Sequence, residues 1–164
     1  MNRSAVLYNE MMKEYLALYK YRGKESLAIP FGQLIKVTYD QYFKETPLDL
    51  ITYVPLHPSR LQERSFNQAE QLATQLSYYT GIPTIGTLKR IKETHKQSKS
   101  GKWERLSEMK DAFQVDEKTK EYIQGKSILI IDDIYTTGAT LNECAQELID
   151  SGAGKVFRLT LARA

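Results

Sequence analysis

The chain has 164 residues, enough for one domain with a hydrophobic core, and its 41% hydrophobic and 26% charged residues are typical of a globular protein. The formal net charge of +3 is too small to indicate a nucleic-acid partner by itself, and no apolar run approaches the ~20 residues needed to cross a bilayer. Cys144 is the single cysteine, so an internal disulfide is excluded, and its thiol is expected to be buried and inert. Because the N-terminus carries no apolar leader, we expect a cytoplasmic protein that does not insert into membranes.

Hydrophobic periodicity predicts helices that alternate with strands along the chain. Helices are expected over residues 11–21, 27–43 with a disturbance at Pro30, 67–79, 103–109 and 141–150. Strands are expected over residues 49–56, 84–88, 113–115, 128–131 and 156–162. This order indicates an α/β fold with a mostly parallel central sheet that helices cover on both faces. We expect a single domain over residues 1–164, in which about residues 1–48 form a helical part and about 49–164 form the core.

The most informative stretch is residues 128–140, which read Ile-Leu-Ile-Ile-Asp-Asp-Ile-Tyr-Thr-Thr-Gly-Ala-Thr. An apolar strand, an acidic pair, a loop rich in hydroxyl groups and the start of a helix follow one another. Unpaired backbone N–H groups and the helix dipole favour an anion at such a helix start. The residues expected to hold a phosphate are Thr136, Thr137, Gly138, Ala139 and Thr140.

Asp132 and Asp133 would repel a phosphate directly, so a different role is expected for them. Carboxylates accept hydrogen bonds from the vicinal hydroxyls of a ribose, and they help to hold Mg²⁺. The alternative is a simple polar turn, which is common after an apolar strand. The stretch is neither a Walker loop nor a G-x-G-x-x-G dinucleotide site.

A second strand, loop and helix are expected around residues 54–68. Two prolines restrict the loop, and Arg60 and Arg64 carry planar donors suited to phosphate oxygens. The alternative is again structural, because loops flanked by proline often only turn the chain. The candidate anion-binding residues of this loop are His57, Pro58, Ser59 and Arg60.

Residues 128–140 resemble the signature of the phosphoribosyltransferases, whose members bind 5-phosphoribosyl-1-pyrophosphate. Pro-Leu-His-Pro-Ser-Arg at 55–60, Glu-Arg-Ser-Phe-Asn-Gln at 63–68 and Lys-Tyr-Arg-Gly at 20–23 are similar to motifs of the ComF family of competence proteins. The resemblance implies a phosphoribosyltransferase-like three-layer α/β sandwich with an N-terminal helical hood, and it covers the chain from about Tyr8. It also implies that Asp132 and Asp133 face the ribose and Mg²⁺, that residues 136–140 wrap the 5′-phosphate, and that residues 57–60 hold the pyrophosphate.

ComF proteins are associated with the uptake of single-stranded DNA, so the resemblance also implies single-stranded DNA and a DNA-uptake helicase as partners. Many ComF proteins begin with a four-cysteine zinc module. One cysteine cannot build a tetrahedral Cys₄ site, so no zinc is expected in this chain.

Residues 89–102 form a polar stretch without apolar periodicity, expected to be mobile. One interpretation is a solvated loop. A second is a single-stranded DNA site, with cations for the phosphates and Trp103 for stacking. A third is a flexible loop that closes over pyrophosphate. The cations concerned are Arg90, Lys92, Lys96, Lys99, Lys102 and Arg105.

Two functions therefore stay open at the level of sequence. The first is a ComF-like protein of DNA uptake that binds 5-phosphoribosyl-1-pyrophosphate or a related sugar phosphate, with single-stranded DNA as a candidate second ligand. The second is an active phosphoribosyltransferase that makes a nucleotide from a nucleobase. A ligand-responsive gene regulator is less favoured, because no DNA-reading helix is identified. Neither the acceptor base nor turnover follows from the binding motifs alone.

Overall fold

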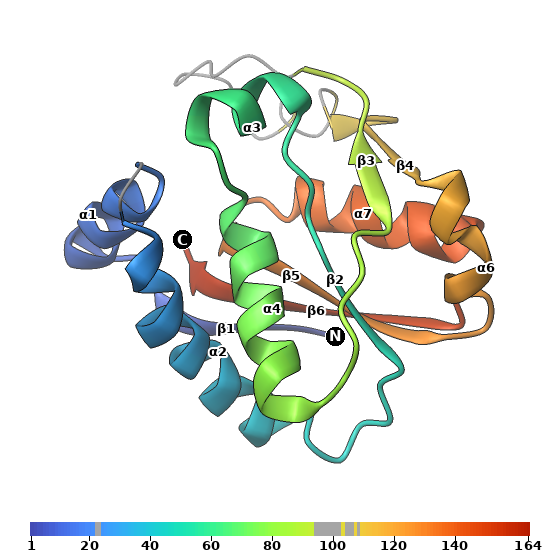
Figure 1. Cartoon of the computed structure of the whole chain (residues 1–164), viewed down its shortest axis with the longest axis horizontal. Coiled ribbons are helices and arrows are strands. Elements are labelled where there is room, and N and C mark those ends of the chain that lie inside the picture. Colours follow the sequence, from blue (N-terminus) through green and yellow to red (C-terminus); the bar gives the residue numbers. More distant parts are fainter. Residues whose placement is uncertain (22–23, 94–102, 104–106, 108) are drawn as a thin grey trace.

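The computed structural model describes residues 1–21, 24–93, 103, 107 and 109–164 (Figure 1). At its centre lies a four-stranded sheet in the order β1-β6-β5-β2, and every neighbouring pair is parallel. The strands are β1 (Asn2–Leu7), β2 (Leu50–Tyr53), β5 (Ser127–Tyr135) and β6 (Lys155–Arg163). Parallel strands need crossover connections, and helices supply them here.

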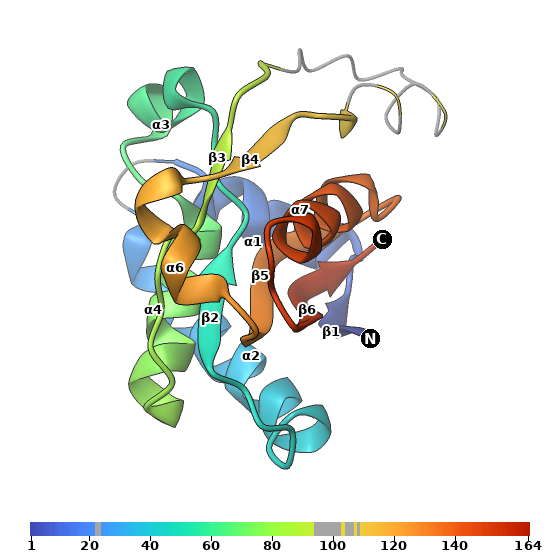
Figure 2. The ribbon, with the colours of Figure 1, turned by 90° about the vertical axis from the view of Figure 1, so that its right-hand side faces the viewer.

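Helices cover one face of this sheet (Figures 1 and 2). They are α1 (Glu10–Tyr19), α2 (Ala28–Tyr42) and α4 (Gln68–Thr80), and the short helix η1 (Glu25–Leu27) leads into α2. Leu129 and Ile131 of β5 are fully buried in the hydrophobic cluster on this face.

The opposite face packs on α7 (Ala139–Asp150) and on a separate two-stranded ribbon (Figure 2). The ribbon consists of β3 (Leu88–Arg90) and β4 (Phe113–Val115), and it leads to η2 (Glu117–Thr119) and α6 (Lys120–Ile123). Ile128 and Ile130 of β5 are buried in this second cluster together with Cys144, which confirms the expected buried thiol. Side chains alternate between the faces of a strand, so a strand covered on both faces is apolar throughout.

The structure differs from the sequence-based expectation in several elements, and β5 itself continues past the expected strand of residues 128–131 as far as Tyr135. Strand β1 lies in a stretch where only helices were expected; its polar Asn2, Arg3 and Ser4 hide the strand pattern. The strand expected over residues 84–88 is reduced to an isolated bridge between Ile51 and Thr84, and pairing resumes only at β3. Pro30 does not disturb α2, because it occupies the first turn, where its missing N–H needs no partner. The helix expected over 103–109 lies largely outside the described residues.

Candidate functional site

The candidate site lies at the C-terminal end of β5, where the apolar strand gives way to two carboxylates. Pairing with β6 continues in register as far as Tyr135, and the side chains alternate between the two faces as far as Asp133. Beyond it the alternation ends, because Ile134 packs against the cluster of Leu129 and Ile131, and Tyr135 against that of Ile128 and Ile130. Asp132 therefore shares a face with Ile130, toward α7. Asp133 shares the opposite face with Ile131, toward α1 and α4. The end of β5 thus presents one carboxylate on each face of the sheet.

The Asp132 carboxyl is the more enclosed of the two groups. Burial disfavours its charged form and raises its pKa well above the usual range, and the neighbouring charge of Asp133 raises the pKa further. The backbone N–H of Asp133 donates to Asp132 Oδ1 over 2.8 Å. Buried carboxyls with raised pKa values are concentrated at functional sites, where a ligand or cation compensates the charge.

The Asp133 carboxylate meets the end of α1. Lys20 Nζ lies 3.7 Å from Asp133 Oδ2, and both side chains are partly buried, with 31% and 19% of their surfaces exposed. Tyr19 fixes this end of the helix, because its fully buried hydroxyl donates to Gln71 Oε1 of α4 over 2.8 Å. The charge of Asp133 also favours the charged form of Arg64, whose pKa burial lowers. Two cations therefore surround this carboxylate.

The loop between β5 and α7 turns at Gly138, which has a φ of +81° and caps the helix. A side chain there would be strained, and its Cβ would lie 2.6 Å from the Tyr135 hydroxyl oxygen. The Thr137 hydroxyl accepts the Ala139 N–H at 3.3 Å, and the Thr140 hydroxyl contacts Met109 Sδ at 3.6 Å.

A hollow of about 20 Å³ lies beside this loop, lined by residues that include Asp132, Tyr135, Thr136, Gly138 and Thr140. That volume holds about one water molecule. A phosphate is larger, so its entry requires the Tyr135 ring or the loop to move.

The loop after β2 leads into α3 (Pro58–Arg64). His57 caps this helix, because its Nδ1 accepts the Ser59 N–H at 3.3 Å, and Pro58 occupies the first turn. The Ser59 hydroxyl donates to Glu93 Oε1 over 2.8 Å, which joins the loop to the chain that follows β3. Arg60 projects from the same short helix.

Asn67 connects the end of β2 to the start of α4 within residues 54–68. Its side chain is buried, with Nδ2 donating to the Val54 carbonyl and Oδ1 accepting the Ala69 N–H, each over 3.0 Å. One amide thus caps α4 and fixes the end of β2 where the candidate pyrophosphate loop begins. Ser65, two residues earlier, adopts a left-handed φ of 71° at the end of α3.

Arg90 occupies the α7 side of the site. The sequence placed it in a mobile basic stretch, whereas the structure places it in strand β3, with its guanidinium 5.6 Å from the centre of the Phe113 ring. Burial lowers its pKa, as does the charge of Arg60, while the charge of Asp132 opposes that shift. Arg60, Arg90 and Asp132 therefore interact at the same end of the sheet.

Of the other candidate cations of the basic stretch, the structure describes Lys92. Lys92 Nζ donates to the Lys110 carbonyl over 2.7 Å. Trp103 is 83% exposed. Lys96, Lys99, Lys102 and Arg105 lie outside the described residues.

Sequence reasoning did not anticipate the roles of Lys20 and Asn67, and it indicated Arg64 only as a donor to phosphate oxygens, not as a neighbour of Asp133. Each belongs to one of the short motifs. The interactions of Lys20 and Arg64 with Asp133 join segments that are far apart in the chain, and the bond from Asn67 to the Val54 carbonyl spans 13 residues, so no local pattern reveals them. In the part of the chain that the structure describes, no three His, Cys, Asp or Glu side chains come together as a metal site. Within the same residues, no helix is both long and apolar enough to span a bilayer.

Comparison with known proteins identifies the family of the chain. Residues 61–163 match the family of phosphoribosyl transferase domains. The chain is 37% identical over 164 residues to competence protein ComFC of Bacillus subtilis (strain 168), covering 99% of this chain and 64% of that protein. It is 33% identical over 162 residues to ComFC of Streptococcus pneumoniae (strain ATCC BAA-255 / R6), covering 99% and 68%. The chain belongs to the ComF family of phosphoribosyltransferase-domain proteins.

The expected family and fold class are thereby confirmed. This ComF-family chain spans 64% and 68% of the lengths of those two competence proteins, so it corresponds to about two thirds of each. Among solved structures it resembles adenine phosphoribosyltransferase from Saccharomyces cerevisiae, with 16% identity, a TM-score of 0.52, and coverage of 91% of this chain and 73% of that one. At that identity the likeness concerns the fold alone.

Proposed function

We propose that this ComF-family chain binds 5-phosphoribosyl-1-pyrophosphate, or a closely related sugar phosphate, at the C-terminal end of β5 and that it serves DNA uptake. The observation that carries the proposal is the junction of Asp132 and Asp133 with the glycine turn that begins α7. Ligands of parallel α/β sheets bind beyond the carboxyl ends of the strands, where this junction lies.

The 5′-phosphate is assigned to residues 136–140. Gly138 leaves the helix start without a Cβ, so phosphate oxygens can approach the backbone N–H groups of the first turn of α7. The hydroxyls of Thr137 and Thr140 form only long contacts, of 3.3 and 3.6 Å, and are therefore easily redirected toward a ligand.

The ribose and the pyrophosphate are assigned to groups on either side of that loop. Asp132 and Asp133 accept hydrogen bonds from the ribose hydroxyls, and they also suit Mg²⁺ that arrives with the pyrophosphate, because this hard cation prefers carboxylate and phosphate oxygens. Arg60 and Arg90 lie on the Asp132 side and favour the pyrophosphate. Lys20 adds a cation on the Asp133 side.

Titration calorimetry with 5-phosphoribosyl-1-pyrophosphate and Mg²⁺ tests the sugar-phosphate site. We expect saturable binding that Gly138→Ala abolishes, because the new Cβ occupies the space in front of the helix start. Equal affinity in the variant would contradict the assignment.

The DNA-uptake role extends to single-stranded DNA, and one observation favours it. Trp103 exposes 83% of its surface and follows the basic stretch in the sequence, and an exposed aromatic ring suits base stacking. Trp103 is the single tryptophan of the chain, so its fluorescence reports directly on binding of an oligodeoxythymidine. We expect quenching that weakens steeply as salt rises. A DNA-uptake helicase is the proposed protein partner.

A transferase activity is the second candidate. The observation in its favour is that the charge of Arg60 lowers the pKa of Arg90, since two guanidinium groups that interact would stabilise a leaving pyrophosphate. Incubation with Mg²⁺, 5-phosphoribosyl-1-pyrophosphate and a panel of nucleobases separates the two functions. Pyrophosphate release that depends on a base would favour the transferase, and binding without release would favour the uptake role.

A further inference from the structure

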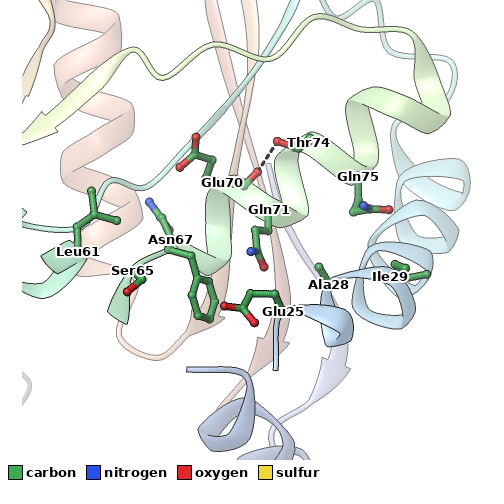
Figure 3. Close-up of a pocket in the computed structure, with 11 residues that line it drawn as sticks. Glu25, Ala28, Ile29, Leu61, Ser65, Asn67, Glu70, Gln71, Thr74 and Gln75 are labelled. Atoms are coloured by element: carbon green, nitrogen blue, oxygen red, sulfur yellow. Dashed lines mark hydrogen bonds between the residues drawn. The ribbon is translucent and has the colours of Figure 1, made fainter. Parts of the chain in front are cut away.

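A second cavity lies away from the β5–α7 loop, between two helical walls (Figure 3). One wall is η1 and the start of α2, and the other is the end of α3 with the first half of α4. Its volume is about 690 Å³, within the range of small-molecule sites. None of the residues that form the acidic pair or the glycine turn lines it.

The charge of this cavity is opposite to that of the chain. Glu25 projects from the η1 wall and Glu70 from the α4 wall (Figure 3), and the described residues that line the cavity include no Lys or Arg. The whole chain, by contrast, carries a formal net charge of +3. Carboxylates without lining cations repel phosphates, so sugar phosphates and DNA are excluded as occupants.

Packing holds the α4 wall in place. Burial, and to a lesser extent the neighbouring Glu70 carboxylate, raises the pKa of Tyr53 to about 12, so Glu70 interacts with the end of β2. Gln71, on the same wall, accepts the Tyr19 hydroxyl at 2.8 Å. Helices α2 and α4 approach closely behind the cavity, where a Cβ at Gly32 would lie 2.6 Å from Gln75 Cβ. The cavity is therefore a formed feature of the fold.

Apolar surface lies between and beside the carboxylates. Ala28 and Ile29 contribute it from α2, and Phe66 and Leu61 from the opposite side. Ile29 is 54% exposed and Leu61 42% exposed, which are large values for aliphatic side chains of a folded domain. An occupant that fits this surface combines methylene groups with positive charge.

We infer that this cavity binds an aliphatic polyamine, with its ammonium groups at Glu25 and Glu70 and its methylene chain on Ile29 and Phe66. The wall along α4 from Asn67 to Gln75 is about 12 Å long at the α-helical rise per residue, which suits an extended chain better than a compact ring. Ammonium groups donate charge-assisted hydrogen bonds to the carboxylates. The inference does not rest on the proposed sugar-phosphate site, because the cavity shares no residue with it.

The test is a nuclear magnetic resonance titration of the whole chain with spermidine in low salt, where exposed charges are least screened. We expect saturable shifts that include the amides of residues 25–29 and 65–75. The variant carrying both Glu25→Gln and Glu70→Gln should bind at least about tenfold more weakly. Glu121→Gln removes an exposed carboxylate on α6 and should leave the affinity unchanged.

Three results would overturn the inference. The first is no saturable shift at these amides, and the second is an equal loss of affinity in Glu121→Gln. The third comes from a blocked trilysine peptide, which carries the same charge as spermidine. Tighter binding of the peptide, lost in the double variant, would make the cavity a docking site for a basic partner segment instead. Unfolding curves of the variants that match those of the parent chain exclude a loss of fold.

Discussion

Lys20 Nζ lies 3.7 Å from Asp133 Oδ2, and this contact joins the end of α1 to the end of β5. The two residues are separated by most of the chain. Lys20 belongs to a motif similar to one of the ComF family, and Asp133 belongs to the stretch that resembles the phosphoribosyltransferase signature. The contact brings a cation to a carboxylate that faces the proposed sugar-phosphate site. The N-terminal helix is therefore a part of that site and does more than cover the sheet.

Lys20→Gln should weaken binding of 5-phosphoribosyl-1-pyrophosphate about tenfold, because the site loses a positive charge that attracts the ligand. The free energy of unfolding should change by no more than about 1 kcal/mol, since ion pairs with partly exposed members contribute little. Calorimetry and urea denaturation measure the two quantities. Lys13→Gln is the matched control, because Lys13 lies on the same helix, where it pairs with Glu10, and should leave the affinity unchanged.

Gly138→Ala should destabilise the fold by more than Gly81→Ala does. Both glycines have positive φ, at +81° and +74°, so both substitutions incur a backbone penalty of about 1–2 kcal/mol. Only at Gly138 does the added Cβ also meet a side chain, the Tyr135 hydroxyl at 2.6 Å; nothing lies within 4 Å at Gly81. Urea denaturation gives the comparison. Equal losses of stability would contradict this prediction, because they would mean that the Tyr135 ring moves aside without a cost in free energy.

Asn67→Ala should reduce the free energy of unfolding by about 2–3 kcal/mol, because it removes a helix cap and leaves the buried Val54 carbonyl without its donor. Asn9→Ala is the control: Asn9 caps α1 through the Met12 N–H at an exposed position and should cost about 1 kcal/mol. Asn67→Asp keeps the cap but sets a carboxylate oxygen against the buried Val54 carbonyl oxygen, so its loss should be at least as large as that of Asn67→Ala. A loss in Asn67→Ala no larger than that in Asn9→Ala would contradict the proposed tie between β2 and α4.

Asp132→Asn should stabilise the ligand-free chain at neutral pH. Burial and the charge of Asp133 raise the pKa of Asp132 in the folded state, while Lys20 lowers it, and the shift remains upward. A carboxyl with a raised folded pKa is favourable when protonated and becomes unfavourable as pH rises from its unfolded pKa, about 3.9, through its folded pKa. The gain in stability of the variant should therefore be absent near pH 3 and grow with pH. A constant difference across that range would rule out this account.

The central elements of the fold follow from local pattern, as β5 and α7 illustrate. Four apolar residues before the acidic pair indicate a strand covered on both faces, and the structure buries Ile128 and Ile130 on one side and Leu129 and Ile131 on the other. Strand β1 cannot be predicted from its local sequence pattern. Its apolar residues are few, and the parallel pairing with β6 that defines it joins opposite ends of the chain.

The candidate site likewise contains some residues that a local pattern reveals and some contacts that it does not. Asp132, Asp133 and Gly138 are recognisable because their chemistry lies in one continuous stretch. The link from Lys20 to Asp133 and the position of Arg90 against Phe113 depend on which elements pack together. The spacing of residues along the chain does not predict such contacts, so they become known only from the tertiary structure.

The double substitution Asp132→Asn and Asp133→Asn tests the central claim most directly, with calorimetry of 5-phosphoribosyl-1-pyrophosphate in the presence of Mg²⁺. The account predicts a folded variant whose affinity falls at least about tenfold, because both acceptors for the ribose hydroxyls and for Mg²⁺ lose their charge. Asp150→Asn, at the far end of α7, should bind as the parent chain does. A double variant that binds the ligand with unchanged affinity would contradict the assignment of the β5 terminus as the sugar-phosphate site.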